Sequence, residues 1–229
     1  MTIAPRFLLA LLLAVWSNAA SAMDLSAEAG IVSDYRFRGI SLSDAKPAAQ
    51  ASVTLEHGSG LYFGTWGSTI KEPSAAITAE VQLFAGYELT LTDNLSLDVS
   101  ANYYAYPSAW DSNYLETTAL ARLDLGEAST ALGWSFTPKQ GGTRDETGRH
   151  SNNYVFAEAS YEVPGTPVKI NSSVGFEKGY FDEAAEGGKW DWTVGAEARL
   201  DDIRVALTYV GSDAREHQDT LVASLVVEF

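Results

Sequence analysis

The sequence predicts an all-β chain that folds as a single antiparallel up-and-down barrel. Apolar and polar side chains alternate with little interruption from Asp24 to Phe229, and a period of two residues is typical of a strand with one apolar face. The alternation divides into about twelve segments, with strand ends uncertain by about two to four residues. Short turns and longer polar loops connect the segments in turn, which favours an up-and-down barrel.

The first 22 residues precede the barrel. Met1–Arg6 is a short basic segment, Phe7–Trp16 is apolar, and Ala20–Ala22 has the small residues of a cleavage site. We therefore expect a secretory signal peptide over residues 1–22, cleaved after Ala22, and a barrel domain over residues 23–229. The apolar run is too short for a spanning helix, which needs about 20 residues.

Each expected strand has an apolar face without a single charged residue. In chain order these faces lie within residues 25–31, 49–55, 61–65, 77–87, 95–103, 115–123, 128–136, 155–163, 168–176, 190–200, 203–209 and 221–229. A lipid bilayer imposes this purity, since Arg or Lys on the lipid face costs ~2–4 kcal/mol at mid-depth. The alternative is a soluble barrel with the apolar faces inward, but twelve such faces would enclose far more space than the eight-strand barrel that side chains just fill.

The connections differ in length in a regular way. The short ones are residues 57–60, 92–94, 124–127, 164–167 and 201–202, and the intervening ones are residues 34–46, 71–74, 107–113, 138–152, 178–188 and 211–219. In outer-membrane barrels the strand number is even, the periplasmic turns are short and the extracellular loops are longer. The pattern predicts a transmembrane antiparallel up-and-down β-barrel of about twelve strands, in the bacterial outer membrane, with both termini at the turn end.

Aromatic side chains cluster near the ends of the expected strands, as in the girdles that flank the apolar band of such barrels. The cluster consists of Tyr87, Tyr103, Trp134, Phe136, Trp190 and Trp192. The last residue, Phe229, is similar to the terminal aromatic signal that the barrel assembly machinery reads. We therefore expect outer-membrane lipid and that machinery as partners.

Composition excludes other classes. The formal net charge of −15 disfavours nucleic acid as a partner because an acidic chain repels phosphates. With no Cys, the chain has neither disulfides nor a thiolate zinc site. No calcium-loop or phosphate-loop pattern occurs, so we expect no cofactor, no metal and no catalytic residue.

Several segments resemble one known family. Val32–Ser41 (VSDYRFRGIS) and Leu61–Ser68 (LYFGTWGS) are the most specific, and Tyr104–Pro107, Asn113–Glu116 and Trp190–Gly195 agree in type and order. They are similar to the TorF family of proteobacterial porins, and the resemblance covers most of the chain after residue 22. It implies an outer-membrane barrel and a channel, names no solute and adds no catalytic residues.

The polar face of each strand is expected to line the lumen. Thirteen acids and six bases lie there, so we expect a channel for passive diffusion of small polar or cationic solutes, since acidic rings favour cations. The candidate pore-lining residues are Asp34, Arg36, Arg38, Tyr62, Trp66, Glu80, Tyr104, Glu116, Arg122, Glu158, Lys169, Asp191, Glu197 and Arg199. The alternative is that these charges pair across a narrow lumen and plug it.

Asp34, Arg36 and Arg38 share one parity at the top of the first strand. They form either a charged constriction at the pore mouth or an internal ion-pair cluster with Glu80 and Glu116. Guanidinium groups suit both arrangements, because their planar forks match carboxylates.

Two other functions stay open. One is a closed structural or partner-binding barrel without conductance. The other, less favoured, is a barrel acyl hydrolase that would use His150 and Ser151, or His217, since such enzymes need a Ser, a His and an orienting partner.

Overall fold

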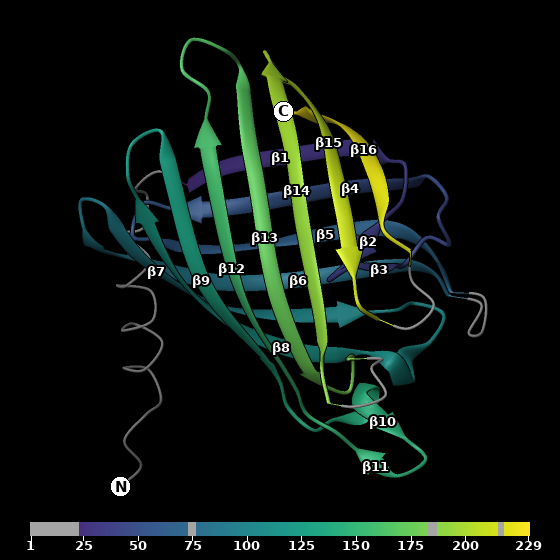
Figure 1. The fold of residues 1–229 in the computed structure, drawn as a ribbon. Helices are drawn as coiled ribbons and strands as arrows, with labels where there is room; N and C mark the ends of the chain where they lie inside the picture. The colour runs from purple at the N-terminus through teal and green to yellow at the C-terminus, as the bar shows by residue number, and fades with distance from the viewer. Residues whose placement is uncertain (1–22, 73–76, 183–186, 215–217) are drawn as a thin grey trace, which may run out of the picture.

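The computed structural model describes residues 23–72, 77–182, 187–214 and 218–229. The expected signal peptide, residues 1–22, and His217 lie outside these ranges. The described chain forms a closed twelve-stranded barrel, which confirms the predicted fold class (Figure 1).

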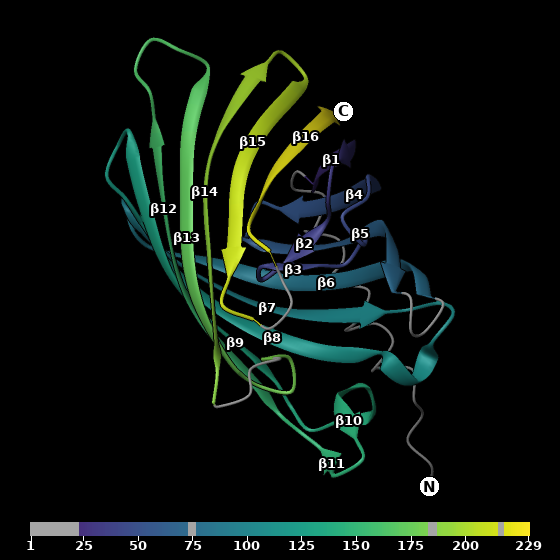
Figure 2. The same cartoon turned by 45° about the vertical axis from the view of Figure 1, so that its right-hand side comes forward.

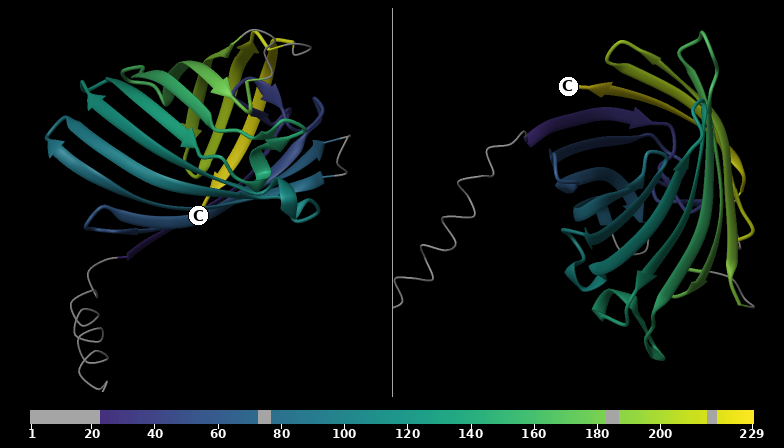
Figure 3. Two further views of the ribbon diagram at one scale, coloured as in Figure 1. Left: turned by 90° about the horizontal axis from the view of Figure 1, so that it is seen from below. Right: turned by 90° about the vertical axis from the view of Figure 1, so that its left-hand side faces the viewer.

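Every barrel strand pairs antiparallel with its neighbours in the chain. The strands are β1 (Met23–Val32), β4 (Ala48–His57), β5 (Leu61–Glu72), β6 (Ile77–Thr92), β7 (Leu95–Ala105), β8 (Tyr114–Asp124), β9 (Ala128–Thr137), β12 (Asn152–Glu162), β13 (Val168–Gly179), β14 (Lys189–Leu200), β15 (Ile203–Ser212) and β16 (Thr220–Glu228). The ring closes where β1 pairs with β16, from Glu28↔Glu228 to Val32↔Ser224. The right panel of Figure 3 shows these two ends of the barrel side by side.

The apolar face of the strands points away from the barrel axis, as expected for a lipid-facing surface. Leu25, Leu132 and Leu221 are 66%, 67% and 61% exposed. Burying such side chains in a soluble core would be worth about 1.5–3 kcal/mol each, so their outward direction favours an apolar environment around the barrel.

Several strands extend further toward the loop end than the alternation predicts. β5 continues to Glu72 rather than Thr65, β12 begins at Asn152, which was expected in a loop, and β15 continues to Ser212. The ladder of backbone hydrogen bonds needs no apolar outward residue, so the wall continues beyond the apolar band.

Two small hairpins lie in segments expected to be irregular loops. They are β2 (Arg36–Phe37) with β3 (Ile40–Ser41), and β10 (Arg144–Asp145) with β11 (Gly148–Arg149); the 3-10 turns η1 (Trp110–Ser112) and η2 (Gly141–Thr143) accompany them. Figures 1 and 2 show β2 and β3 inside the ring of barrel strands, whereas β10 and β11 project from the loop end. Among the described residues, no helix has the length and apolar character needed to cross a membrane.

The packed core lies inside the barrel at its loop end. Each of the twelve strands contributes a buried side chain there: Val32, Ala48, Ile70, Glu80, Tyr104, Glu116, Thr137, Asn152, Glu177, Lys189, Val210 and Val222. A lumen filled with water would leave these side chains exposed. The loop-end half of the lumen is therefore filled by side chains and by the segment that contains β2 and β3.

Candidate functional site in the barrel lumen

Residues 33–47, called the lumen hairpin below, turn inward from the end of β1. Since β1 ends at Val32, the expectation that Asp34, Arg36 and Arg38 lie on the first strand is wrong. The turn between β2 and β3 places Gly39 at φ +83°, a conformation that favours glycine. A Cβ atom at Gly39 would lie 2.5 Å from Cβ of Ser212, so glycine also lets the hairpin approach the wall at β15.

Arg38 reaches from the lumen hairpin to the opposite wall. Its Nη2 donates to Glu116 Oε1 and its Nη1 to Glu177 Oε1, each at 2.7 Å. Glu116 is on β8 and Glu177 on β13, five strands from β1 in one direction around the ring and four in the other. One guanidinium fork thus joins the first loop to two separate strands across the lumen.

Lys189 completes a charge-balanced network with Arg38. Its ammonium lies 2.7 Å from Glu177 Oε2 and donates to the Arg38 carbonyl at 3.0 Å. The side chains of Lys189 and Glu177 are 1% and 0% exposed. Two cations and two carboxylates cancel, which buried charges require. Thr137 and Asn152 donate further hydrogen bonds to the carboxylates, at 3.0 and 2.9 Å.

The neighbouring carboxylates keep the Arg38 guanidinium charged although it is buried. Burial alone lowers the pKa of Arg38, but the carboxylates of Glu116 and Glu177 outweigh burial and keep the pKa above its ordinary value. Aromatic rings add to the site, because the Arg38 guanidinium lies 4.1 Å from the ring centre of Tyr154 and 4.6 Å from that of Phe37.

The other hairpin contacts lie within the hairpin, against the wall, and at the loop between β15 and β16, where Arg36 Nη1 donates to the Gln218 carbonyl at 2.8 Å. Arg36 Nε donates to Asp34 Oδ2 at 2.7 Å, within the hairpin itself. Tyr35 packs on Trp66 with ring centres 5.2 Å apart and donates its hydroxyl to Glu80 at 3.1 Å. Burial, followed by the charge of Glu80, raises the pKa of Tyr35 well above its ordinary value. Glu80 therefore pairs with a tyrosine and not with an arginine, contrary to the sequence expectation.

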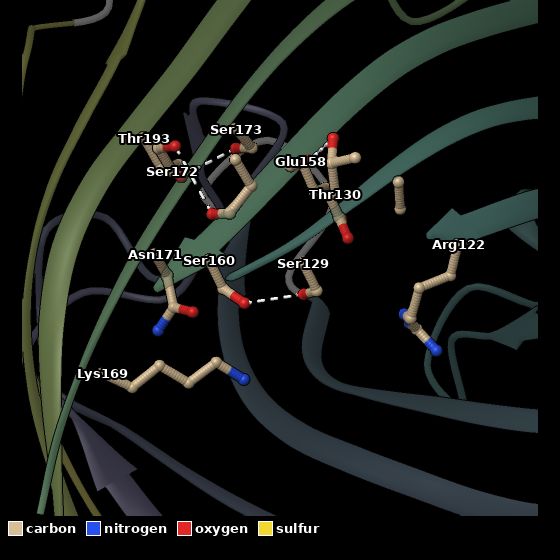
Figure 4. Close-up of a pocket in the computed structure, with 12 residues that line it drawn as sticks. Arg122, Ser129, Thr130, Glu158, Ser160, Lys169, Asn171, Ser172, Ser173 and Thr193 are labelled. Atoms are coloured by element: carbon tan, nitrogen blue, oxygen red, sulfur yellow. Dashed lines mark hydrogen bonds between the residues drawn. The ribbon is translucent and has the colours of Figure 1, made fainter. Parts of the chain in front are cut away.

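The turn-end half of the lumen is open to solvent. One cavity of about 320 Å³ is lined by side chains that include Arg122, Glu158 and Lys169 (Figure 4). A second, of about 430 Å³, adjoins it at Arg122 and includes Tyr62. The aromatic ring of Tyr62 lies flat against Gly86 on the next strand, where a Cβ atom would collide with it. Laid along the wall in this way, the ring leaves space in the lumen.

The predicted pore-lining residues divide between these two halves. The structure brings together the loop-end members: Asp34, Arg36, Arg38, Trp66, Glu80, Tyr104, Glu116 and Asp191, the last accepting a hydrogen bond from Tyr154 at 3.0 Å. The turn-end members are Tyr62, Arg122, Glu158, Lys169, Glu197 and Arg199, of which Arg199 pairs with Glu228. Their role in a pore stays a prediction.

The candidate residues from the sequence do not include Tyr35, which contacts Glu80, or Lys189 and Glu177, which belong to the network with Arg38. Tyr35 has the opposite parity to Arg36, so a strand pattern does not place both inside. The sequence pattern places Lys189 at the boundary between a loop and a strand. Lys189 and Asp191 are two residues apart and therefore lie on the same face of β14, and this spacing is the sequence feature that indicates an inward direction for Lys189.

The hydrolase residues do not form a catalytic arrangement within the described residues. The same atom of His150, Nε2, contacts both Thr147 Oγ1 at 2.9 Å and Asp145 Oδ1 at 3.0 Å. A triad instead uses the two ring nitrogens for the nucleophile and the acid. No group of three or more His, Asp or Glu with metal-binding geometry occurs in the described part of the chain.

The fold is a closed, twelve-stranded antiparallel barrel with charged side chains in its lumen. The chain belongs to the Gcw_chp family, described as bacterial proteins of unknown function, whose profile matches residues 16–227. The sequence matches no curated protein.

Solved structures with a similar fold include porins and channels. The KdgM porin superposes with a TM-score of 0.63 at 9% identity, over 89% of this chain and 98% of that one. The NanC porin superposes with a TM-score of 0.62 at 11% identity, over 90% of this chain and 99% of that one. The COG4313 outer membrane channel from Pseudomonas putida F1 superposes with a TM-score of 0.51 at 12% identity, over 91% of this chain and 97% of that one. At such identities the likeness shows the fold.

Proposed function

We propose that the protein is an outer-membrane channel for passive diffusion of small polar solutes, with a preference for cations, and that the lumen hairpin is its constriction. The short turns then face the periplasm and the loops face outward. The hairpin and the side chains around it fill the loop-end half, so the solute enters the open turn-end half when the hairpin leaves its place.

The charged, solvent-open turn-end half carries this proposal. Among the described residues, Glu56, Glu88, Glu158 and Glu197 have no cationic group within 4.0 Å, and neither Arg122 nor Lys169 has an anionic one. A barrel that serves only as a support gains nothing from unpaired charges around a water space. Acids outnumber bases here, and acidic linings favour cations.

The resemblance to the TorF porins and the porin fold support the same function. Export through a signal peptide at residues 1–22, and assembly through Phe229, belong to this proposal. Phe229 is 79% exposed at the turn end, and its backbone N donates to Ala27 O at 2.9 Å, so its ring is available to a partner.

Planar-bilayer recording tests the proposal. We expect discrete steps, with a reversal potential in a salt gradient that indicates cation preference. Replacing Glu56 and Glu88 by Gln together should move the reversal potential toward zero. Glu146→Gln removes one charge on an exposed loop and serves as the control. An unchanged reversal potential in the double variant would contradict the role of the turn-end acids.

A second candidate, the closed partner-binding barrel, is favoured by the ring of buried side chains from all twelve strands. Replacing residues 35–42 with a short glycine linker separates the two candidates. If the folded, heat-modifiable variant is as silent as the parent, the closed barrel is correct. If the variant conducts ions, the lumen beyond the hairpin is an open path for solutes, and the channel is correct.

A further inference from the structure

A third cavity, of about 400 Å³, lies between the lumen hairpin and the wall formed by β4, β5, β6 and β7. Figure 2 shows β2 and β3 inside the ring, next to these strands. The cavity shares Thr54 and Phe84 with the cavity of about 430 Å³ in the turn-end half, so the two adjoin and together reach from the hairpin to the open turn end. Five of the side chains that line the third cavity are aromatic: Tyr35, Phe37, Trp66, Phe84 and Tyr104.

Three rings follow one another along the lumen toward the turn end. In the register between β5 and β6, Trp66, Phe84 and Tyr62 lie at successive inward positions, each two residues nearer the turn end than the one before. Phe84 covers Gly64 on the neighbouring strand, where a Cβ atom would lie 2.5 Å from Cζ of the ring, in the same way that Tyr62 covers Gly86. A ring that covers a glycine of the wall presents its other face to the lumen.

The wall next to these rings is acidic. Of the barrel strands β1, β4, β5, β6 and β7, only β5 contains a Lys or Arg, and that residue, Lys71, pairs with Asp44 at the loop end. Glu56, Glu88 and Asp98 line the cavity of about 430 Å³. Among the described residues none of these three carboxylates has a cationic group within 4.0 Å.

Two of the three carboxylates face each other. Glu88 is directly opposite Asp98 between β6 and β7, and like charges at opposed positions repel. Tyr62 donates a hydrogen bond to Asp98 at 2.8 Å, but the charge of Glu88 stays uncompensated. Arg122 is the one arginine or lysine that the described chain contributes to this lining. Three carboxylates and one guanidinium leave an excess of negative charge, so the cavity attracts a cation and repels an anion.

The rings favour an organic cation over an inorganic one. An aromatic face attracts an ammonium group and also packs against an apolar body. The lumen already contains such a pair, since the Arg38 guanidinium lies 4.6 Å from the ring centre of Phe37. Glu56 and Tyr62 are opposite each other, and Phe84 lies two residues further along the register, about 7 Å away along a strand. A three-carbon chain between an ammonium group and a ring spans a comparable distance.

We propose that the two adjoining cavities bind organic monocations with an aromatic or alkyl body, with the ammonium group beside Glu56 and Glu88 and the body on Phe84 and Trp66. This rests on the proposed channel function and names a solute class for it. The turn-end half is open to solvent, so the ligand reaches the site from that end while the hairpin is in place.

Equilibrium binding to the folded, detergent-solubilised protein tests the proposal. Three probes share one skeleton and differ in charge: 3-phenylpropylamine, which is protonated at pH 7 as a lysine amine is, 3-phenylpropanol and 3-phenylpropionate. We expect the amine to bind at least threefold more tightly than the alcohol, and the carboxylate to bind least.

Two variants separate the charge from the ring. Glu88→Gln should weaken binding of the amine about threefold, as for an exposed charge pair, and leave binding of the alcohol unchanged. Phe84→Leu should weaken binding of both about threefold, because the contact between rings is lost. Loss of structure would not spare the alcohol in one variant and affect both probes in the other.

Each variant has a matched control. Glu146→Gln removes one acid from an exposed loop. Phe156→Leu removes a ring that covers Gly133 in the same way but lines neither cavity. Neither control should change the affinity for the amine.

Equal affinity for the amine and the alcohol, or an affinity for the amine that either Glu88→Gln or Phe84→Leu leaves unchanged, would overturn the site. Binding needs no conductance. A silent barrel that binds the amine therefore refutes the channel alone, and a conducting barrel that does not bind it refutes the site alone.

Discussion

Replacing Arg38 by Gln should release the lumen hairpin and increase the single-channel conductance several-fold. Gln keeps most of the volume but removes the charge that faces Glu116 and Glu177. Removing one partner of a buried ion pair costs about 3–5 kcal/mol because the other charge stays buried and unpaired. Water can enter the lumen, so the hairpin leaves its place once that cost exceeds the free energy that holds it there.

Two measurements on the same variant check this reasoning. Planar-bilayer recording gives the conductance, and hydrogen–deuterium exchange reports the protection of residues 35–43. Arg38→Lys keeps the charge but lacks the planar fork that meets two carboxylates, so we expect an intermediate conductance. Lys139→Gln, at an exposed loop position outside the hairpin, should change neither. Unchanged conductance and unchanged protection in Arg38→Gln would refute the role of Arg38 in holding the hairpin.

Three further predictions concern the hairpin and the chain end. Gly39→Ala should loosen the hairpin at a cost of about 1–3 kcal/mol, because a Cβ would meet Ser212 at φ +83°, and faster exchange of residues 35–43 should show it. Lys71 and Lys46 lower the pKa of Asp44 to about 2. Their stabilisation of the loop is therefore complete above the unfolded pKa and is lost as pH falls through about 2, so wild type and Asp44→Asn should differ in loop exchange at pH 6 and agree below pH 2. Deleting Phe229 should lower the yield of barrel in the outer membrane, measured by heat-modifiable protein in membrane fractions, and leave refolding in detergent unchanged.

The barrel wall was predictable because lipid constrains it residue by residue. A charge at Leu132 or Val194 would face hydrocarbon, so the outward face of every strand is apolar and the alternation is visible in the sequence. The turns at Thr92–Asn94 and Asp201–Asp202 were equally clear, because two-residue and three-residue connections leave few alternatives for strand ends.

The lumen hairpin was not predictable in the same way. Its segment reads as a polar loop, and nothing in a local pattern shows that a loop folds inward. The partners of Arg38 are 78 and 139 residues away in the chain, so only the closed ring brings them together. Glu80 and Glu116 both point inward, so the sequence pattern offers both as partners for the arginines. In the structure Arg38 pairs with Glu116, whereas Glu80 accepts a hydrogen bond from the Tyr35 hydroxyl.

The hairpin and the wall are held by different interactions, so one can change without the other. The wall depends on backbone hydrogen bonds between twelve strands, and none of those bonds includes Arg38 or its partners' side chains. The hairpin depends on a neutral network of four charges and on aromatic contacts at the loop end. Loss of Arg38 should therefore alter conductance and exchange in residues 35–43 while the barrel stays heat-modifiable on a gel. A variant that lost both at once would show that the hairpin is part of the barrel's own stability, and a constriction that moves independently of the wall would then be impossible.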